Sequence, residues 1–451
     1  MLLTLKTLTP EHLTRPLTKV STKPPLGGFF MYDYIIDEEL PLTNNLRPHQ
    51  LRAYDNMSQH DCGQIIVPTG GGKTYIMIED CKRFLNNNRN KTIVVVAPRI
   101  LLANQLSEEF LSELSDVDVL HVHSGETHHQ STTKSPNISW WCLTSNRNRI
   151  IFTTYHSLHR VLDSDVSIGT IYFDEAHNGT GKSFFEGVIR CYQRQLRRYF
   201  FTATPRISRG KEKTRGMDNI KVWGDILEQT PAQELLDSGT ILPPKVITFD
   251  TDRERTKQNA HEVDGDNLKD IIRSMDIHSP KILVSAPTTR IMWNMLTQTD
   301  TQDWIYREGY DIMHITSKHG AYINKKKVGR EEFFKTLTDW GKDDNKKFVI
   351  FHYSILSEGI NVPGLTHSVM LRNLPTIEMA QTIGRVIRVH NEDRKSVDSG
   401  VIPAGKFDLY QKSCGKIVVP MTGKYGSRIE RRLQSIVNYI FVEGIPPLSY
   451  V

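Results

Sequence analysis

The chain has few cysteines and no long apolar run. Its five cysteines lie far apart, and no two of them form a C-x-x-C pair. A disulfide framework or a cysteine-rich zinc site is therefore not expected, and a reducing compartment fits this usage. No apolar run approaches the ~18 residues that a membrane-spanning helix needs. The first 25 residues also lack the apolar core of a secretory signal. We expect no membrane partner and an intracellular location, which is the cytoplasm if a bacterium or a phage encodes the chain.

A strong net charge is missing as well. The 57 Lys and Arg residues nearly balance the 51 Asp and Glu residues, which leaves a formal charge of +6. This mild basic excess permits a nucleic-acid partner but does not by itself indicate one. Charged residues make up 24% of the chain and hydrophobic residues 38%, as in folded globular proteins. At 451 residues the chain has room for about two to four domains.

The most informative feature that is present is a glycine-rich loop that ends in a lysine. The loop follows an apolar strand candidate at 64–67 and precedes the apolar stretch 75–78, the order that a phosphate-binding loop requires. Its expected nucleotide-binding residues are Thr69, Gly70, Gly71, Gly72, Lys73 and Thr74. Lys73 can reach the β- and γ-phosphates, and the Thr74 hydroxyl can bind Mg²⁺. The strict motif opens with glycine where this chain has Val67, and a purely structural turn is the alternative.

Strands and helices alternate in two regions that are separated near residue 240. The first region has β-rich runs at 64–67, 92–97, 150–154, 170–173 and 199–203, with a helical pattern at 99–114. The second has such runs at 281–286, 311–315, 347–351, 367–371 and 416–419. This alternation predicts an α/β fold whose parallel sheets are covered on both faces. The proline pair in 239–244 indicates a connector between the regions.

Three polar stretches, 124–149, 207–220 and 252–267, are predicted to be loops. The first of them contains Trp140 and Trp141, which could stack on unpaired bases or pack locally. Four histidines lie in or near it: His121, His123, His128 and His129. Because no acidic or cysteine residue accompanies them at ligand spacing, we expect a solvated loop rather than a metal site.

An apolar strand candidate ends in the acidic pair Asp174 and Glu175, about a hundred residues after Lys73. Nucleotide hydrolases place a carboxylate beside Mg²⁺ in this way. We expect Asp174 to hold the metal and Glu175 to act as the general base that deprotonates the attacking water. An acidic pair alone is a weak signal, but its combination with the glycine loop is a strong one.

These motifs and several others together resemble a superfamily 2 helicase or translocase of the DEAH type. The acidic pair continues as Asp-Glu-Ala-His, and the segments 201–205 (Phe-Thr-Ala-Thr-Pro) and 381–388 (Gln-Thr-Ile-Gly-Arg-Val-Ile-Arg) follow it. Further matches stand in family order at 46–50, 97–99, 153–158, 285–288 and 354–363. The stretch 223–244 is similar to restriction-enzyme motor subunits and phage recombination helicases. The resemblance covers roughly residues 45–420.

The resemblance implies two tandem RecA-like domains with the ATP site at their interface. The expected division is an N-terminal extension at 1–44, domain 1 at 45–239, domain 2 at 240–420 and a C-terminal helix within 421–451 that packs on domain 2. ATP and Mg²⁺ are the implied cofactors. Residues implied to bind the nucleotide in addition to the loop are Arg47, Gln50, Gly359 and Asn361. Asn361 stands where the family commonly has Asp, so it keeps hydrogen-bonding capacity but lacks the negative charge.

Two further groups of residues take their expected roles from the resemblance. Coupling of hydrolysis to movement is implied for His177, Thr202 and Thr204. Nucleic-acid contacts, mostly to phosphates, are implied for Pro98, Arg99, Thr154, Tyr155, Ala286, Pro287 and Thr288. A tight turn after a core strand is the alternative for Thr202 and Thr204, and a surface salt bridge is the alternative for Arg99.

Gln381, Arg385 and Arg388 are spaced i, i+4 and i+7, so on a helix they would share one face. Two guanidinium groups directed into a cleft can neutralise the charge on a transferring phosphoryl group. We expect domain 2 to supply these arginines to ATP bound on domain 1. A solvated basic helix face is the alternative.

The sequence therefore predicts an ATP hydrolase that acts as a helicase or translocase on nucleic acid. DNA is the preferred partner, strand separation or remodelling of branched DNA is the expected activity, and a nuclease or recombination factor is a candidate protein partner. Three alternatives stay open: an RNA helicase, the motor subunit of a restriction or defence complex, and a nucleotide-dependent scaffold with little turnover.

Overall fold

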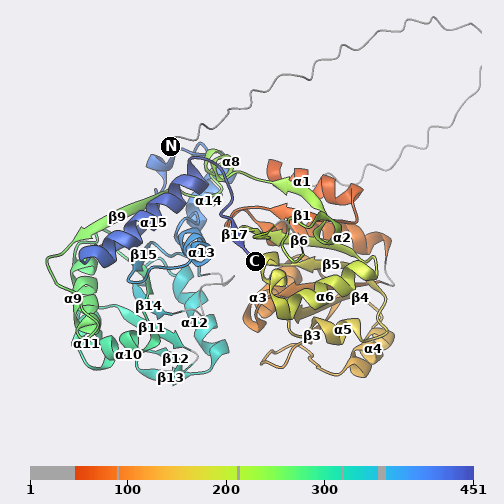
Figure 1. Cartoon of the computed structure of the whole chain (residues 1–451), viewed down its shortest axis with the longest axis horizontal. Helices are drawn as coiled ribbons and strands as arrows, with labels where there is room; N and C mark the ends of the chain where they lie inside the picture. The colour runs from red at the N-terminus through yellow and green to blue at the C-terminus, as the bar shows by residue number, and fades with distance from the viewer. Residues whose placement is uncertain (1–45, 89–90, 211–213, 317, 354–361) are drawn as a thin grey trace, which may run out of the picture. The chain divides into compact units, whose positions relative to one another are not determined.

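A computed structural model describes residues 46–88, 91–210, 214–316, 318–353 and 362–451. The predicted extension at 1–44 lies outside these residues, and so do Gly359 and Asn361. Leu46–Val451 form one unit by their contacts, and two sheets organise it (Figure 1). In the described part of the chain, no helix is both long and apolar enough to cross a membrane.

The first sheet has seven strands, and its neighbouring strands all run parallel. In spatial order they are β3 (Val117–Val122), β4 (Asn148–Thr154), β2 (Thr92–Ala97), β5 (Ile168–Phe173), β6 (Arg197–Thr202), β1 (Cys62–Ile66) and β8 (Asp225–Gln229). The five predicted apolar runs are confirmed as the five inner strands. The two edge strands, β3 and β8, were not predicted, because an edge is partly exposed and their sequences include acidic residues.

Helices cover both faces of the first sheet. Strand β2 shows the division, because Ile93 and Val95 belong to one apolar core while Val94 and Val96 belong to the other. The first core is closed by α1 (Pro48–Gln59), α2 (Lys73–Asn87) and α3 (Ile100–Glu113). The second is closed by α4 (Ser135–Thr144), α5 (Leu158–Leu162), α6 (Lys182–Gln193) and α7 (Ile220–Trp223), together with the 3₁₀ helix η1 (Ala176–Thr180).

The second sheet has eight strands, and only its edge hairpin is antiparallel. In spatial order they are β13 (Lys326–Val328), β12 (Gly320–Ile323), β11 (Asp311–Thr316), β14 (Phe348–His352), β10 (Lys281–Ser285), β15 (His367–Met370), β16 (Gly415–Met421) and β9 (Pro244–Asp250). The five predicted strands are present. The edge strands β9 and β13 and the short strand β12 beside β13 were not predicted, because they are short or carry polar and partly exposed residues. The expected α/β fold with two parallel-dominated sheets is confirmed.

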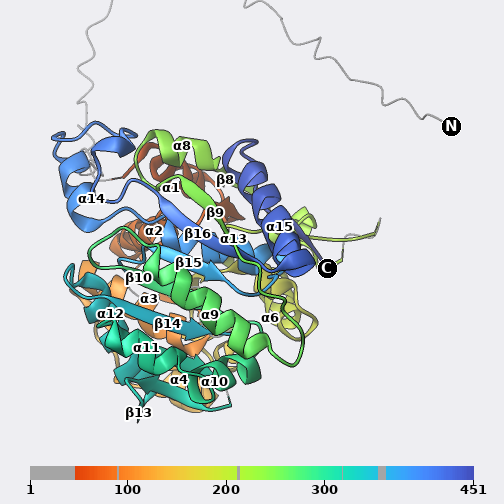
Figure 2. The same ribbon diagram turned by 90° about the vertical axis from the view of Figure 1, so that its left-hand side faces the viewer.

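The second sheet is also covered on both faces, by helices that Figure 2 shows from the outer side. One face packs against α9 (Ala260–Arg273), α10 (Thr289–Thr297) and α11 (Thr301–Arg307). The core of the other face includes residues of α8 (Ala232–Asp237), α12 (Arg330–Lys342), α13 (Thr376–Val386) and α15 (Gly423–Phe441). Two short elements, α14 (Asn391–Asp398) and η2 (Phe407–Leu409), follow α13 in sequence. The helix predicted near the C-terminus is α15, whose apolar positions face this core as their spacing predicts.

Two of the three predicted loops contain regular structure, so these loop predictions are wrong in part. Helix α4 lies within 124–149, where Ile138 and Trp141 supply the apolar face that closes the core. Helix α9 begins at Ala260, inside 252–267, and Arg255 there makes an ion pair with Asp264. Composition did not reveal these helices, because the core that α4 packs against comes from other parts of the chain. The Arg255–Asp264 ion pair, in turn, lies within a run that is mostly polar.

The C-terminal residues return to the first sheet's side of the molecule. Strand β17 (Ser449–Tyr450) pairs in parallel with β7 (Arg206–Ile207), which follows the predicted coupling segment. The backbone N–H of Ser449 donates to the carbonyl of Pro205 at 3.2 Å. A segment that follows α15 is thereby joined to the end of the Thr202–Pro205 motif.

Candidate nucleotide site between the two sheets

The loop between β1 and α2 has the backbone shape that phosphate binding requires. Gly70 and Gly72 have φ values of 93° and 81°, in the left-handed region that favours glycine. A Cβ atom on Gly71 would lie 2.4 Å from Cγ1 of Val67. Helix α2 begins directly afterwards at Lys73, so its free N–H groups and the positive end of its dipole point toward the loop. This arrangement suits an anionic ligand.

Side chains of α1 hold the loop from behind. Nε2 of His49 lies 2.7 Å from the carbonyl oxygen of Gly71, and the Gln50 amide donates to the same oxygen at 3.3 Å. The backbone N–H of Arg47 donates to Oε1 of Gln50 at 2.9 Å. His49 was not predicted as a site residue, although it stands beside Gln50 in the motif. A contact of Gln50 with the nucleotide stays a prediction, since its amide here donates to the carbonyl oxygens of Gly71 and Gly72.

The acidic pair follows β5 and is buried. Asp174 and Glu175 are each 7% exposed. Burial, together with the negative charge of Glu175, raises the pKa of the Asp174 carboxyl, and the nearby Lys73 opposes this rise. Glu175 has a φ of 45°, which is a strained conformation for a side chain of its size. Tyr155 anchors the turn, since its hydroxyl donates to the backbone oxygen of Asp174 at 2.9 Å.

Two of the three predicted coupling residues, Thr202 and Thr204, contact the imidazole of the third, His177. Nδ1 of His177 lies 3.1 Å from Oγ1 of Thr202 and 3.2 Å from Oγ1 of Thr204. The same nitrogen lies 3.5 Å from Oε2 of Glu175. All four residues are buried. A continuous polar path therefore leads from the acidic pair to the segment that ends at Pro205.

The three residues of the last motif reach one cavity, but not from one helix. Helix α13 ends at Val386, so Arg388 lies beyond it and the prediction of a shared helix face is wrong for this residue. Ile241 forms an antiparallel bridge with Arg388, and the N–H of Leu242 donates to the carbonyl of Ile387 at 2.7 Å. These contacts turn the chain out of the helix, and no local spacing signals them.

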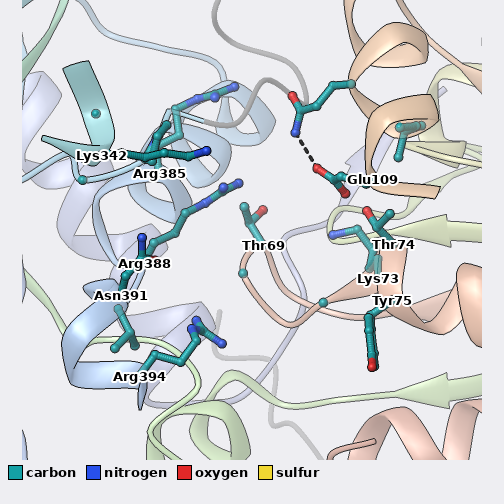
Figure 3. Close-up of a pocket in the computed structure, with 18 of the residues that line it drawn as sticks. Thr69, Lys73, Thr74, Tyr75, Glu109, Lys342, Arg385, Arg388, Asn391 and Arg394 are labelled. Atoms are coloured by element: carbon teal, nitrogen blue, oxygen red, sulfur yellow. Dashed lines mark hydrogen bonds between the residues drawn. The ribbon is translucent and has the colours of Figure 1, made fainter. Parts of the chain in front are cut away.

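The cavity has a volume of about 530 Å³ and is lined from both sheets. From the first sheet come Thr69, Gly70, Gly72, Lys73, Thr74, Asp174 and Glu175, and from the second come Gln381, Arg385 and Arg388. Figure 3 shows Lys73 and Thr74 on one side and the arginines on the other. Glu109, Lys342 and Arg394 also line it, although no motif marked them. Helix α13 approaches closely because residue 384 is glycine, whose Cβ would lie 2.5 Å from Cβ of Thr69.

The residues that are present fit a magnesium ion. The Thr74 hydroxyl and the Asp174 carboxylate are oxygen donors of the kind that Mg²⁺ prefers, and both line the cavity. Two buried carboxyl groups side by side repel each other, and a divalent cation would relieve this repulsion.

The predicted nucleic-acid residues follow the carboxyl ends of three parallel strands. Pro98 and Arg99 follow β2, Thr154 and Tyr155 lie at the end of β4, and Ala286, Pro287 and Thr288 follow β10. Their exposure differs. Thr288 is exposed and Pro98 and Arg99 are partly exposed, whereas Thr154, Tyr155, Ala286 and Pro287 are buried. Their contacts with nucleic acid stay predictions.

The two tryptophans of helix α4 have different environments. Trp141 packs in the core and is 7% exposed, so local packing is the outcome for this ring. Trp140 is 68% exposed. Base stacking by Trp140 stays a prediction.

Comparisons with known proteins identify the same kind of fold. The sequence profile of the family described as "Type III restriction enzyme, res subunit" matches residues 43–207. No curated protein matches the chain in sequence. Among solved structures, the ATP-dependent Type ISP restriction-modification enzyme LlaBIII bound to DNA is 15% identical, with a TM-score of 0.63 over 90% of this chain and 31% of that chain.

Two more solved structures are similar. A nuclease-deletion mutant of the Type ISP enzyme LlaGI, in complex with a DNA substrate mimic, is 16% identical, with a TM-score of 0.57 over 90% of this chain and 30% of that chain. A fragment attributed to the HsdR subunit of a type I restriction enzyme from Vibrio vulnificus YJ016 is 14% identical, with a TM-score of 0.57 over 89% of this chain and 68% of that chain.

At these identities the similarity to the solved structures concerns the fold. The chain spans about a third of the length of the two Type ISP enzymes. The resemblance to superfamily 2 motors is confirmed by the family profile and by this shared fold. Residues 43–207 thus match the profile of the family described as "Type III restriction enzyme, res subunit", and the whole two-sheet fold is similar to that of solved restriction-enzyme structures.

Proposed function

We propose that the chain is an ATP-dependent motor that moves along nucleic acid, with DNA as its track. The observation that carries this proposal is the cleft with two different walls. A phosphate loop and an acidic pair line one wall, and two arginines from the other sheet line the opposite wall. Hydrolysis of a nucleotide held between two such walls changes the contacts that join them, which is how a motor converts chemistry into movement.

The residues of each wall have distinct roles in this proposal. The N–H groups of residues 69–74 hold the phosphates, and Lys73 neutralises charge on the β- and γ-phosphates. A Mg²⁺ ion held by Thr74 and Asp174 would polarise the phosphate oxygens when bound. Glu175 accepts the proton of the attacking water. Arg385 and Arg388 stabilise the charge that develops on the transferring phosphoryl group.

Gln381 supports this assignment from the second sheet. It lines the cavity and is 4% exposed. Neither its amide oxygen nor its amide nitrogen has a hydrogen-bond partner among the described residues. Buried polar atoms are normally satisfied, so this amide suits a polar ligand such as the nucleotide or the attacking water.

His177 is proposed to carry the state of the nucleotide to the rest of the molecule. Its imidazole contacts the Thr202 and Thr204 hydroxyls and lies near the Glu175 carboxylate. Loss of the γ-phosphate would shift Glu175 and thereby change these contacts. We propose domain limits of 45–239 and 240–420 for the parts that move, although α8, which precedes residue 240, contributes to the second core.

DNA is proposed as the track because two similar solved structures are described as bound to DNA or to a DNA substrate mimic. Contacts through phosphates would give weak sequence specificity and strong salt dependence. We also propose that the motor separates the DNA strands. This is a separate step, since a translocase can move on DNA without unwinding it.

The test is ATP hydrolysis by the purified chain, alone and with single-stranded, duplex or forked DNA or RNA, with Lys73→Ala as the control. We expect strong stimulation by DNA that is abolished in the control. Stimulation by RNA alone would replace DNA with RNA as the track. No hydrolysis under any condition would favour a nucleotide-dependent scaffold and overturn the motor proposal.

The family profile favours a second candidate, the motor subunit of a restriction complex whose nuclease lies on another chain. Its test is co-purification of the tagged chain from its source, followed by a DNA-cleavage assay. A stable nuclease partner, with cleavage only when both chains and ATP are present, would support it. Full DNA-stimulated hydrolysis and unwinding by the chain alone would favour an independent motor.

A further inference from the structure

A cluster of two histidines and a glutamate lies beside the cleft, outside the nucleotide site. Nε2 of His128 lies 2.8 Å from Oε1 of Glu108, and Nε2 of His129 lies 3.1 Å from the same oxygen. The histidines follow β3, whereas Glu108 lies on α3. The acidic partner of these two histidines is therefore supplied by a helix that precedes them in sequence.

The three donor atoms are close enough to share one metal ion. They all lie within 4.8 Å of one another. Zn²⁺ binds imidazole nitrogen and carboxylate oxygen at about 2.0–2.2 Å, so ligand atoms around it lie about 3–3.5 Å apart. Two imidazoles and one carboxylate form a donor set that favours Zn²⁺, Co²⁺ or Ni²⁺ over Mg²⁺. This preference separates the cluster from the oxygen donors Thr74 and Asp174.

The second nitrogen of His128 is directed at another carboxylate. Its Nδ1 atom lies 3.7 Å from Oε1 of Glu331, which is on α12 of the second sheet. Histidines that bind metals usually donate their other N–H to a carboxylate, which fixes the tautomer and the orientation of the ring. Here that carboxylate comes from the opposite side of the cleft. It leaves Nε2 of His128 to face Glu108 and His129.

The His129 ring is held by stacking. It lies parallel to the His121 ring, with centroids 4.9 Å apart and an angle of 6° between the planes. The centroids of the His128 and His129 rings are 4.0 Å apart. Two protonated imidazoles at this distance would repel each other, so an arrangement of simple ion pairs to one carboxylate is unfavourable. Neutral rings that share a cation avoid this repulsion.

We propose that Glu108, His128 and His129 bind one divalent transition-metal ion of the zinc class, and that Glu331 orients His128 across the cleft. Metal binding then stabilises the arrangement in which α3 and α12 approach each other. The neighbour of Glu108, Glu109, lines the nucleotide cavity. The ion would consequently be a structural clamp beside the ATP site and separate from the catalytic Mg²⁺.

The test is metal binding by the full chain, purified without a polyhistidine tag and stripped with a chelator. Zn²⁺ is titrated against a chromophoric chelator, and Co²⁺ is used to record the absorption spectrum of the site. We expect one equivalent to bind tightly in the presence of excess Mg²⁺. His129→Ala and Glu108→Gln should lose this binding, whereas His278→Ala, which changes an exposed loop histidine, should retain it. Thermal unfolding without metal verifies that each variant is folded.

The proposed role of Glu331 in orienting His128 is tested separately, by the Zn²⁺ affinity of a Glu331 variant. Glu331→Gln should weaken Zn²⁺ binding by about tenfold while one equivalent still binds. An unchanged affinity in this variant would overturn the contribution from α12. Absence of stoichiometric binding, or equal binding by all the variants, would overturn the site and leave an ion-paired cluster only. These measurements need no ATP turnover, so their outcome is independent of the proposed motor activity.

Discussion

The two walls of the proposed nucleotide cleft are built in different ways. The first-sheet wall consists of residues 69–74 with Asp174 and Glu175, and consecutive residues determine most of its shape. The second-sheet wall consists of Gln381, Arg385 and Arg388. Arg388 lies beyond the end of α13, where its backbone forms an antiparallel bridge with Ile241. One wall is therefore local in origin, and the other depends on contacts between distant parts of the chain.

The difference between the walls indicates that a sequence motif predicts side-chain positions well when its shape depends on consecutive residues, and less well when it depends on distant contacts. The glycine loop has its shape because its glycines adopt positive φ values that other residues avoid. The arginine motif names the right residues, but its helical spacing predicted the wrong element for Arg388. Variants in the first-sheet wall should disturb chemistry directly, whereas variants around the second-sheet wall should also disturb how the walls meet.

The largest effect is expected from loss of an arginine of the second-sheet wall. Arg385→Ala should lower kcat for ATP hydrolysis by about 10³-fold, because arginines placed on a transferring phosphoryl group contribute on this scale. Steady-state hydrolysis with saturating DNA measures it. Arg431→Ala, on the exposed face of α15, is the matched control and should be unaffected. A full rate in Arg385→Ala would remove the second sheet from the chemistry.

A smaller but still large loss is expected in the first-sheet wall. Glu175→Gln should lower kcat by about 10²-fold or more and retain ATP binding, because a general base is lost while the phosphate loop stays intact. Hydrolysis and equilibrium binding of a fluorescent ATP analogue measure the two parts. Glu186→Gln, on the exposed side of α6, serves as the control. Unchanged hydrolysis would mean that another group activates the water.

The close approach of the walls can be tested at Gly384. Gly384→Ala would place a Cβ atom 2.5 Å from Cβ of Thr69, so the walls must separate. A small displacement of reacting groups should reduce kcat/KM for ATP by about tenfold. Thr69→Gly should restore part of the loss in the double variant, and the two single variants complete the cycle. Additive losses would show that the contact does not limit closure.

The smallest effect concerns the support of Arg388. Nζ of Lys412 donates to the carbonyl oxygens of Arg388 and Leu365 at 2.8 and 2.6 Å, and burial lowers the pKa of this lysine to about 7. The unfolded lysine keeps a pKa near 10.4. Between these values the unfolded chain binds more protons, so this group makes the folded state more stable as the pH rises.

Lys412→Met should therefore remove a rise in the free energy of unfolding of about 1 kcal/mol per pH unit between pH 7 and 9. Urea unfolding at several pH values measures the difference between the variant and the wild type. Lys335→Met, at an exposed position of α12, should keep the wild-type slope. Equal slopes in all three proteins would show that Lys412 titrates normally.

Much of the fold could be predicted because inner strands of a parallel sheet are apolar on both faces. The ten predicted strands are present, whereas edge strands such as β3, β8 and β9 were missed because half-exposed strands carry polar residues. Helix α4 was missed for a related reason, since it is short, is flanked in sequence by polar residues and buries only a few apolar side chains.

The sequence alone determined the glycine loop that we propose to bind phosphate, the acidic pair and the identity of the arginines, because each depends on residue chemistry and short-range backbone conformation. Only the tertiary structure decided that Arg388 leaves the helix, that Lys412 supports it and that Glu108 joins His128 and His129. These arrangements depend on hydrogen bonds and packing between residues that are distant in the chain. Neither spacing nor composition records such contacts, since the free energy that selects them arises only when the elements pack together.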